Sequence, residues 1–219
     1  DDIEWLDDQA LPALRRLFTQ KSVALAAPRL VLQQDKSPLV VAGPHVVGEG
    51  ALLQNYVGER QGLAERGYLN RLQMAQDVAG VHGSCWMARR SAVLAAGGLD
   101  ETCTPTFQPV TDLGYRLQQS GWRLVWTPQA NALHAGGMTV NALRRDPAQA
   151  LALSQAAMAE ARHMRNRWLS LAGEHPLYSK HLSSSKPYAL DMHLVNRWSQ
   201  DYRARPRVLA QPLSSGSGQ

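Results

Sequence analysis

Apolar and polar positions follow two different periods along the chain, and segments of each period alternate. Leucines recur at helical spacing across residues 9–19, with arginines on the opposite side, so this segment predicts a short amphipathic helix. Residues 23–32 and 39–47 are rich in Val, Leu and Ala and predict two strands joined by a polar turn. Residues 48–67 are Gly-rich and without clear period. They predict a surface loop that either closes over a substrate or only connects two elements.

The next part of the chain predicts two more strands and two short helices. Residues 84–89 alternate as a short strand would, and Ser91 stands where a helix N-cap is expected. Asp112 occupies the corresponding position before a second helix, and Gly121 is placed to end that helix in a left-handed conformation. Residues 123–127 then predict a strand closed by a proline. The order strand, helix, loop, helix, strand indicates an α/β protein.

A long helix is predicted after this region. Asp146 and the proline that follows it form a good N-cap and first turn, and the helical pattern continues to about residue 171. An apolar stripe along it predicts a packing face. The stripe comprises Ala150, Leu153, Ala157, Ala161, Met164, Trp168 and Leu171.

These patterns divide the chain into consecutive parts. Residues 1–145 are expected to form an α/β core, and residues 146–172 a helix that straps across it. Residues 173–205 are expected to form an extended tail. Residues 206–219 are either a linker or the start of a following domain, with a strand-like run leading into a Gly- and Ser-rich segment.

Composition and charge argue against some classes of function and leave others open. The net charge is +5, but the arginines are scattered singly or in pairs, with no basic stripe and interleaved aromatics, so no nucleic-acid partner is expected. The positive charge suits diphosphate substrates and anionic lipids equally well. Cys85 and Cys103 are too few for a disulfide framework and predict free thiols in the cytoplasm. No apolar run approaches the ~20 residues of a membrane span, so no transmembrane segment is expected.

Three motifs together resemble the acceptor half of a family 2 glycosyltransferase with the GT-A fold. They are GSCWMARRSAVLAAGGLDE at 83–101, DLGYRL at 112–117 and PQANALH at 128–134. The resemblance covers about residues 1–190. It implies a mixed sheet flanked by helices, with the N-terminal nucleotide-binding half largely outside the chain. It also implies a multi-domain bacterial enzyme that builds a surface polysaccharide such as O-antigen or capsule, with a further Rossmann-type transferase domain.

The resemblance further implies the chemistry. A sugar would pass from a nucleotide-diphosphate donor to a growing glycan or lipid-linked glycan, with inversion, and Mg²⁺ or Mn²⁺ would neutralise the leaving diphosphate. Asp2 matches the second acid of the family's Asp-x-Asp metal motif, and His134 matches a metal-binding histidine. An acidic helix start and a structural strand-end histidine are the alternatives. The substrate-binding residues implied are Gly83, Ser84, Trp86, Asp100 and Glu101. Trp86 equally fits a buried strand position.

The expected catalytic base is missing from its usual position. Relatives carry Glu-Asp or Asn-Asp two or three residues before the Asp that caps the following helix, and those positions are Pro109 and Val110 here. Valine cannot accept a proton, so Asp112 is the candidate base, although a carboxylate that caps a helix is normally a weak one. Two interpretations stay open. The chain belongs either to an active enzyme with a displaced base, or to a degenerate sugar-binding or scaffolding module.

The end of the long helix carries one more resemblance to a known motif. Arg167 and Trp168 resemble the Arg-Trp pair of membrane-bound polysaccharide synthases, but Met164 replaces the glutamine that opens that motif, so no role is assigned to them. A peripheral association with the inner face of the membrane is compatible with the charge.

Overall fold

The computed structural model describes most of the core and parts of the tail. The described residues are 3–5, 7–34, 37–47, 53–55, 61–101, 108–134, 142–171, 175–179, 181–183, 185–186 and 188–191. The expectations for Asp2, Cys103 and residues 192–219 lie outside them.

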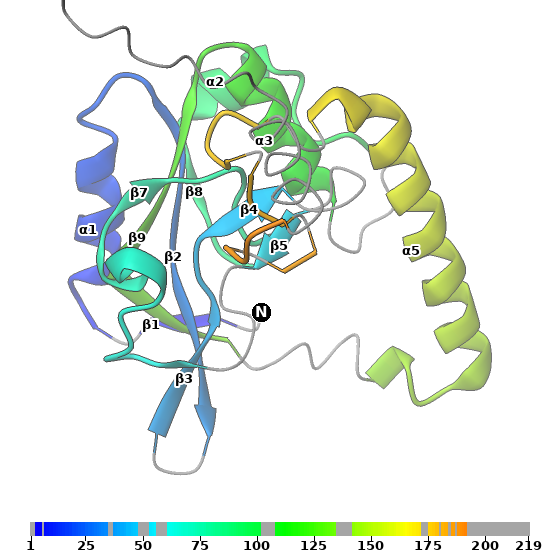
Figure 1. The fold of residues 1–219 in the computed structure, drawn as a ribbon, viewed down its shortest axis with the longest axis horizontal. Coiled ribbons are helices and arrows are strands. Elements are labelled where there is room, and N and C mark those ends of the chain that lie inside the picture. Colours follow the sequence, from blue (N-terminus) through cyan, green and yellow to red (C-terminus); the bar gives the residue numbers. More distant parts are fainter. Residues whose placement is uncertain are drawn as a thin grey trace, which may run out of the picture.

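A mixed seven-stranded sheet forms the centre of the fold (Figure 1). Its two long strands, β2 (Val23–Gln34) and β9 (Arg123–His134), run parallel and adjacent. The shorter strands pair antiparallel with them: β1 (Ile3–Trp5) and β7 (Gln76–Asp77) with β9, β3 (Ser37–Ala42) and β8 (Met87–Ala88) with β2, and β6 (Gln61–Gly62) with β3. The strands β4 (His45–Val47) and β5 (Leu53–Asn55) form a separate antiparallel pair.

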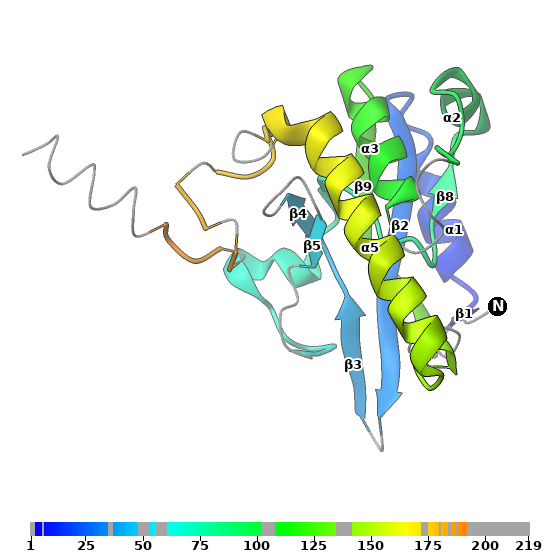
Figure 2. The same ribbon diagram turned by 90° about the vertical axis from the view of Figure 1, so that its right-hand side faces the viewer.

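Helices cover both faces of this sheet (Figure 2). Along β2, Ala26 packs with α1 (Ala10–Leu17), whereas Leu25 and Ala27 pack with α3 (Pro109–Gln119). Because successive strand residues point to opposite faces, α1 and α3 lie on opposite sides. The long helix α5 (Pro147–Trp168) stands outside α3. The expected mixed α/β sheet flanked by helices is confirmed.

Two predicted helix starts are wrong. The helix α2 (Arg90–Ala95) begins before Ser91, and Arg89 is its N-cap residue. The helix α3 begins at Pro109, so Asp112 lies inside the first turn rather than at the cap. Proline is well tolerated at the first helical position because its missing N–H has no intrahelical partner there. The predicted left-handed stop is confirmed, since Gly121 has φ +81°.

The predicted end of the strand at Pro128 is wrong. β9 continues through Pro128 to His134. Its pairing with β2 shifts register at this point, from Thr127 to Asn131, so the proline disrupts no regular ladder. A glycine in α3 allows the helix close to the strand, because a Cβ on Gly114 would lie 2.9 Å from Cδ2 of Leu124.

The long helix is confirmed, but its predicted packing stripe holds only near its C-terminal end. Asp146 caps the helix by accepting from the backbone N–H groups of residues 148 and 149 at 2.8 and 3.1 Å. The buried residues of α5 are Glu160, Met164 and Trp168. Leu151 and Met158 in the earlier turns are about 60% exposed. No helix among the described residues is both long and apolar enough to span a bilayer.

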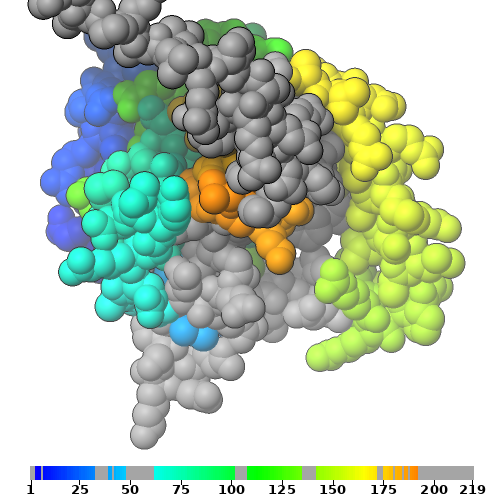
Figure 3. Space-filling view, in the orientation of Figure 1, coloured from blue at the N-terminus to red at the C-terminus, as the bar shows by residue number. Residues whose placement is uncertain are grey.

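The described tail residues dock through tyrosines. The ring of Tyr188 stacks on Tyr68 at 4.6 Å between centroids and meets Tyr178 edge-on at 5.5 Å. Figure 3 shows the tail residues up to 191 lying beside the segment that contains Tyr68. The tail therefore packs against a segment more than 100 positions earlier in the sequence.

Candidate functional site

The segments singled out by sequence meet at the start of α3. The Oγ of Ser84 lies 3.0 Å from Nε2 of His134 at the end of β9. A Cβ on Gly83 would lie 3.9 Å from Cγ2 of Val110 in the first turn of α3. Residues 83–84, 110 and 134 therefore form one neighbourhood, although about 50 residues separate the most distant of them.

The N-terminal strand reaches the same place. In the antiparallel pairing of β1 with β9, Ile3 lies opposite His134 and Glu4 opposite Leu133. The start of β1 therefore lies next to His134. Asp2 itself lies outside the described residues, so its proposed role at a metal stays a prediction.

Three histidines extend this site into a row. His82 contacts His134 edge-on at 5.6 Å, and His45 lies 6.1 Å from His82, measured between ring centroids. We call His45, His82, Ser84 and His134 the histidine rim. Sequence reasoning missed His45 and His82 because neither belongs to a recognised motif, and only the fold brings them together.

Burial keeps two of these imidazoles neutral. It lowers the pKa of His45 to about 3, and the nearby charge of His82 adds to this effect. Burial also lowers the pKa of His82 to about 4, with a further contribution from His134. The Nδ1 of His82 accepts from the backbone N–H of Ser84 at 3.2 Å. At neutral pH these rings therefore act as hydrogen-bonding groups and not as cations.

Asp112, two residues after Val110, lies in a cluster of strong polar contacts. Its side chain is completely buried. Oδ2 accepts from Nε of Arg116 at 2.7 Å, and Oδ1 accepts from the indole N–H of Trp168 at 2.8 Å. Nη1 of Arg167 lies 3.3 Å from Oδ1. We call Asp100, Asp112, Arg116, Arg167 and Trp168 the Asp112 cluster.

This cluster joins three elements. Arg116 donates to the carbonyl oxygens of Ala96 and Gly98 in the turn after α2, the latter at 2.7 Å. Arg167 donates to Asp100 at 2.7 Å. Arg167 and Trp168, to which the sequence assigned no role, both contact Asp112. The missing glutamine of their motif does not prevent these contacts.

A second carboxylate comes to the start of α3 from α5. Glu160 is buried, and its Oε1 accepts from the backbone N–H of Gln108, the N-cap residue of α3, at 3.0 Å. A carboxylate at a helix N-terminus is favoured by the helix dipole. Glu160 thus brings a carboxylate from another helix to Gln108, the residue before positions 109 and 110.

The remaining predicted residues are spread around this centre. Trp86 is partly buried and packs against the cluster that contains Leu113 and Leu124, which favours its core interpretation. Glu101 is exposed. Among the described residues, no three His, Cys, Asp or Glu side chains are arranged to hold a metal ion. The described part of the chain therefore does not by itself fit the implied metal.

Comparison with known proteins finds partial similarity to a sugar transferase and to an uncharacterized protein. No family model matches the chain. Over 106 residues it is 35% identical to N-acetylglucosaminyl-diphospho-decaprenol L-rhamnosyltransferase of Mycobacterium tuberculosis, a match that covers 48% of this chain and 30% of that protein. It is 29% identical over 138 residues to the uncharacterized protein y4gI of Sinorhizobium fredii, covering 61% of this chain and 14% of that protein.

A solved structure aligns with part of the chain. The crystal structure of GalNAc-T7 with UDP, GalNAc and Mn²⁺ aligns with a TM-score of 0.45 and 12% identity, over 60% of this chain and 26% of that chain. The matches span less than a third of each of these proteins.

Proposed function

We propose that this chain is part of a family 2 glycosyltransferase of GT-A type, which transfers a sugar from a nucleotide-diphosphate donor to a glycan or lipid-linked glycan. The similarity to a rhamnosyltransferase supports the reaction class. The observation that carries the proposal is the meeting of Gly83, Ser84, Val110 and His134 at one end of the sheet. We further propose that its product is a surface polysaccharide assembled at the cytoplasmic face of the membrane.

The proposed reaction is one displacement. A hydroxyl oxygen of the acceptor forms a bond to the anomeric carbon of the donor sugar, and the bond from that carbon to the diphosphate oxygen breaks. The nucleoside diphosphate leaves with the bonding electrons, and the hydroxyl proton passes to a base on the protein. The new glycosidic bond has the opposite anomeric configuration. Gly83 and Ser84 line the acceptor side in this proposal, together with Asp100 and Glu101, whereas Trp86 belongs to the core.

Two carboxylates are candidates for the base. Asp112 is the sequence-based candidate, but its side chain is completely buried, so its surroundings must move before a substrate hydroxyl can reach it. Glu160 holds the start of α3 from the opposite side. Val110 is the position where relatives carry the base. Asp112 comes two residues after it on α3, and Glu160 of α5 contacts Gln108, two residues before it.

The test uses the full-length protein and an N-acetylglucosaminyl-diphospho-lipid acceptor with a panel of nucleotide-activated sugars, rhamnose included. Transfer of labelled sugar to the lipid supports the proposal. Asp112→Asn and Glu160→Gln are then compared, and loss of a general base is expected to lower kcat by about 10²- to 10⁴-fold. Circular dichroism and the Tm separate lost chemistry from lost folding. No transfer with any donor, in a folded protein that binds no nucleotide sugar, would contradict the proposal.

A non-catalytic sugar-binding module is the second candidate, and Val110 is the observation that favours it. The decisive variant is Val110→Asp, which restores a carboxylate beside Gly83. Acceptor binding without transfer in the natural protein, followed by transfer in the variant, would identify a degenerate module. Transfer by the natural protein excludes it.

A further inference from the structure

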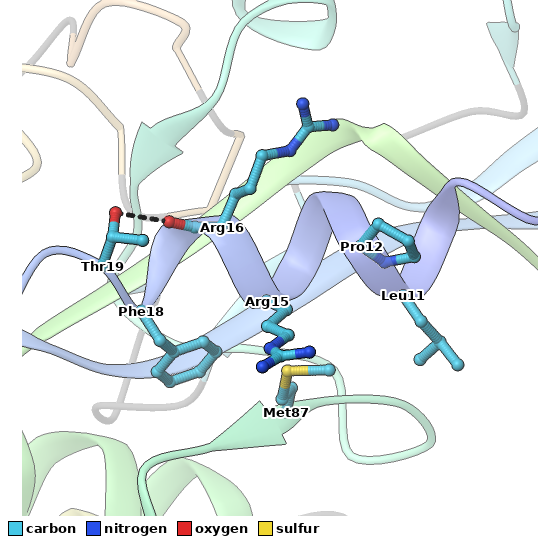
Figure 4. A pocket seen from close by; sticks show the side chains of 7 residues that line it. All are labelled: Leu11, Pro12, Arg15, Arg16, Phe18, Thr19 and Met87. Atoms are coloured by element: carbon cyan, nitrogen blue, oxygen red, sulfur yellow. Dashed lines mark hydrogen bonds between the residues drawn. The ribbon is translucent and has the colours of Figure 1, made fainter.

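A hollow lies on the opposite side of the sheet from α3, between α1 and β8 (Figure 4). Its volume is about 740 Å³, within the usual range of ligand sites. The residues that line it are Leu11, Pro12, Arg15, Arg16, Phe18, Thr19 and Met87. Two of these seven are arginines and none is acidic.

The walls of the hollow are apolar and its centre is cationic. Figure 4 shows the side chain of Arg15 extending from α1 toward Met87, with Phe18 and Leu11 on either side of it, while Arg16 points away from Met87. Leu11 is 46% exposed, although the opposite side of α1 is buried against the sheet. The helix therefore presents an apolar surface with a positive group at its middle.

Further basic residues lie near the C-terminal end of α1. Arg89 donates to the carbonyl oxygens of Phe18 and Gln20 at 2.9 and 3.2 Å, and the exposed residues Arg90 and Lys21 directly follow Arg89 and Gln20 in the chain. None of the ion pairs among the described residues includes Arg15, Arg16, Lys21 or Arg90. Two cations, Arg15 and Arg16, thus line an apolar hollow without an ion-pair partner in the described part of the chain.

We propose that this hollow docks the protein on a membrane, with the phosphate of an anionic phospholipid on the arginines and part of an acyl chain on the apolar walls. Basic residues are attracted to anionic lipid surfaces, and exposed apolar side chains on an amphipathic helix enter the boundary between headgroups and chains. A small soluble phosphate would use only the arginines. The apolar walls therefore favour the lipid.

The position of the hollow agrees with such a role. Because α1 and α3 cover opposite faces of the sheet, docking through α1 leaves the face of α3 and α5 uncovered (Figure 2). The proposal is independent of sugar transfer, since lipid binding requires neither donor nor acceptor. Failure of one proposal therefore leaves the other unaffected.

The experiment is co-sedimentation of the full-length protein with vesicles of phosphatidylglycerol and phosphatidylcholine, compared with phosphatidylcholine alone. Binding is expected only to the anionic vesicles and is expected to weaken in high salt. The double variant Arg15→Gln, Arg16→Gln should bind about 30-fold more weakly, from the known attraction per basic residue. The matched control is Arg144→Gln, Arg145→Gln, an exposed arginine pair elsewhere with the same change of net charge. It should bind like the natural protein.

A second pair of variants tests the apolar part. Leu11→Ser should weaken binding about 3- to 10-fold, because it removes apolar surface from the hollow. Leu151→Ser, on the exposed part of α5, should leave binding unchanged. Equal losses in both arginine pairs would indicate nonspecific attraction and overturn the proposal. So would equal binding to both kinds of vesicle, competition by inorganic phosphate alone, or no binding by the folded protein.

Discussion

The Asp112 cluster and the histidine rim hold their polar groups in opposite ways. In the cluster, a fully buried carboxylate accepts strong N–H donors from two helices. In the rim, burial keeps His45 and His82 uncharged. A buried carboxylate with several N–H donors fixes elements to one another, whereas neutral imidazoles such as His45 and His82 are suited to hydrogen bonding with a ligand. The first region is expected to control stability and the second to control binding.

The largest stability effect should come from Trp168. Trp168→Ala removes a buried indole that packs edge-on against Tyr115 at 5.3 Å and donates to Asp112. The free energy of unfolding of this variant, measured in urea, should be about 3–5 kcal/mol lower than that of the natural protein. Leu169→Ala, next in sequence and 62% exposed, should change it by less than about 0.5 kcal/mol. Similar values for both variants would mean that α5 does not stabilise the core.

The next test compares a buried ion pair with an exposed one. Asp112→Asn leaves Arg116 and Arg167 facing a neutral side chain in the interior and should cost about 3 kcal/mol. Asp77→Asn breaks the partly exposed pair of Asp77 with Arg123 at 2.9 Å and should cost less than about 1 kcal/mol. Urea unfolding measures both. If the two substitutions lower the free energy of unfolding equally, the Asp112 cluster does not hold the surrounding elements together as we propose.

The pH dependence of stability tests whether His45 is neutral in the folded chain. The pKa of His45 is about 3 in the folded chain and near 6.5 when unfolded, so the unfolded chain takes up a proton that the folded chain excludes. Stability present above the unfolded pKa is therefore lost as the pH falls toward the folded one. His45→Gln cannot titrate. Between about pH 7 and about pH 5 it should lose about 2 kcal/mol less stability than the natural protein. Parallel urea-unfolding curves for the two proteins would contradict the lowered pKa.

The smallest stability effect should come from the rim at His134. His134→Ala and Ser84→Ala, which remove the two ends of a single 3.0 Å contact, should each cost about 1 kcal/mol or less. His134→Ala should nevertheless abolish Mn²⁺ binding measured by calorimetry on the full-length protein, if Asp2 and His134 hold the metal as we predict. Ser84→Ala is the control that should retain binding. Mn²⁺ binding unaffected by His134→Ala would remove His134 from the metal site.

Local patterns predicted most elements of the fold. The helix at residues 9–19, the long helix after Asp146 and the stop at Gly121 depend on neighbouring residues alone, and the structure has them. The cap at Asp112 was wrong because Pro109 is compatible with the first helical turn, so the helix starts earlier. The strand end at Pro128 was wrong because a register shift in the pairing with β2 accommodates it.

The site was less predictable because its contacts are not local. Motifs identified Ser84 and His134, and the fold joins them. The contacts of Asp112 with Trp168 and of Gln108 with Glu160 connect positions 56 and 52 residues apart, and no pattern in either segment reports the other. His45 and His82 carry no motif at all. Their neutrality depends on burial, which only the packed structure defines.

The distance in sequence between Asp112 and Trp168 has a consequence for how the protein is made. At translation rates of about 5–20 residues per second, the 56 residues between them take about 3–11 seconds to emerge. During that interval the nascent chain holds an acidic side chain whose indole donor has not yet been synthesised. We expect the ribosome-bound chain to complete this core only after α5 has left the exit tunnel, so that a chaperone has time to bind before the final docking.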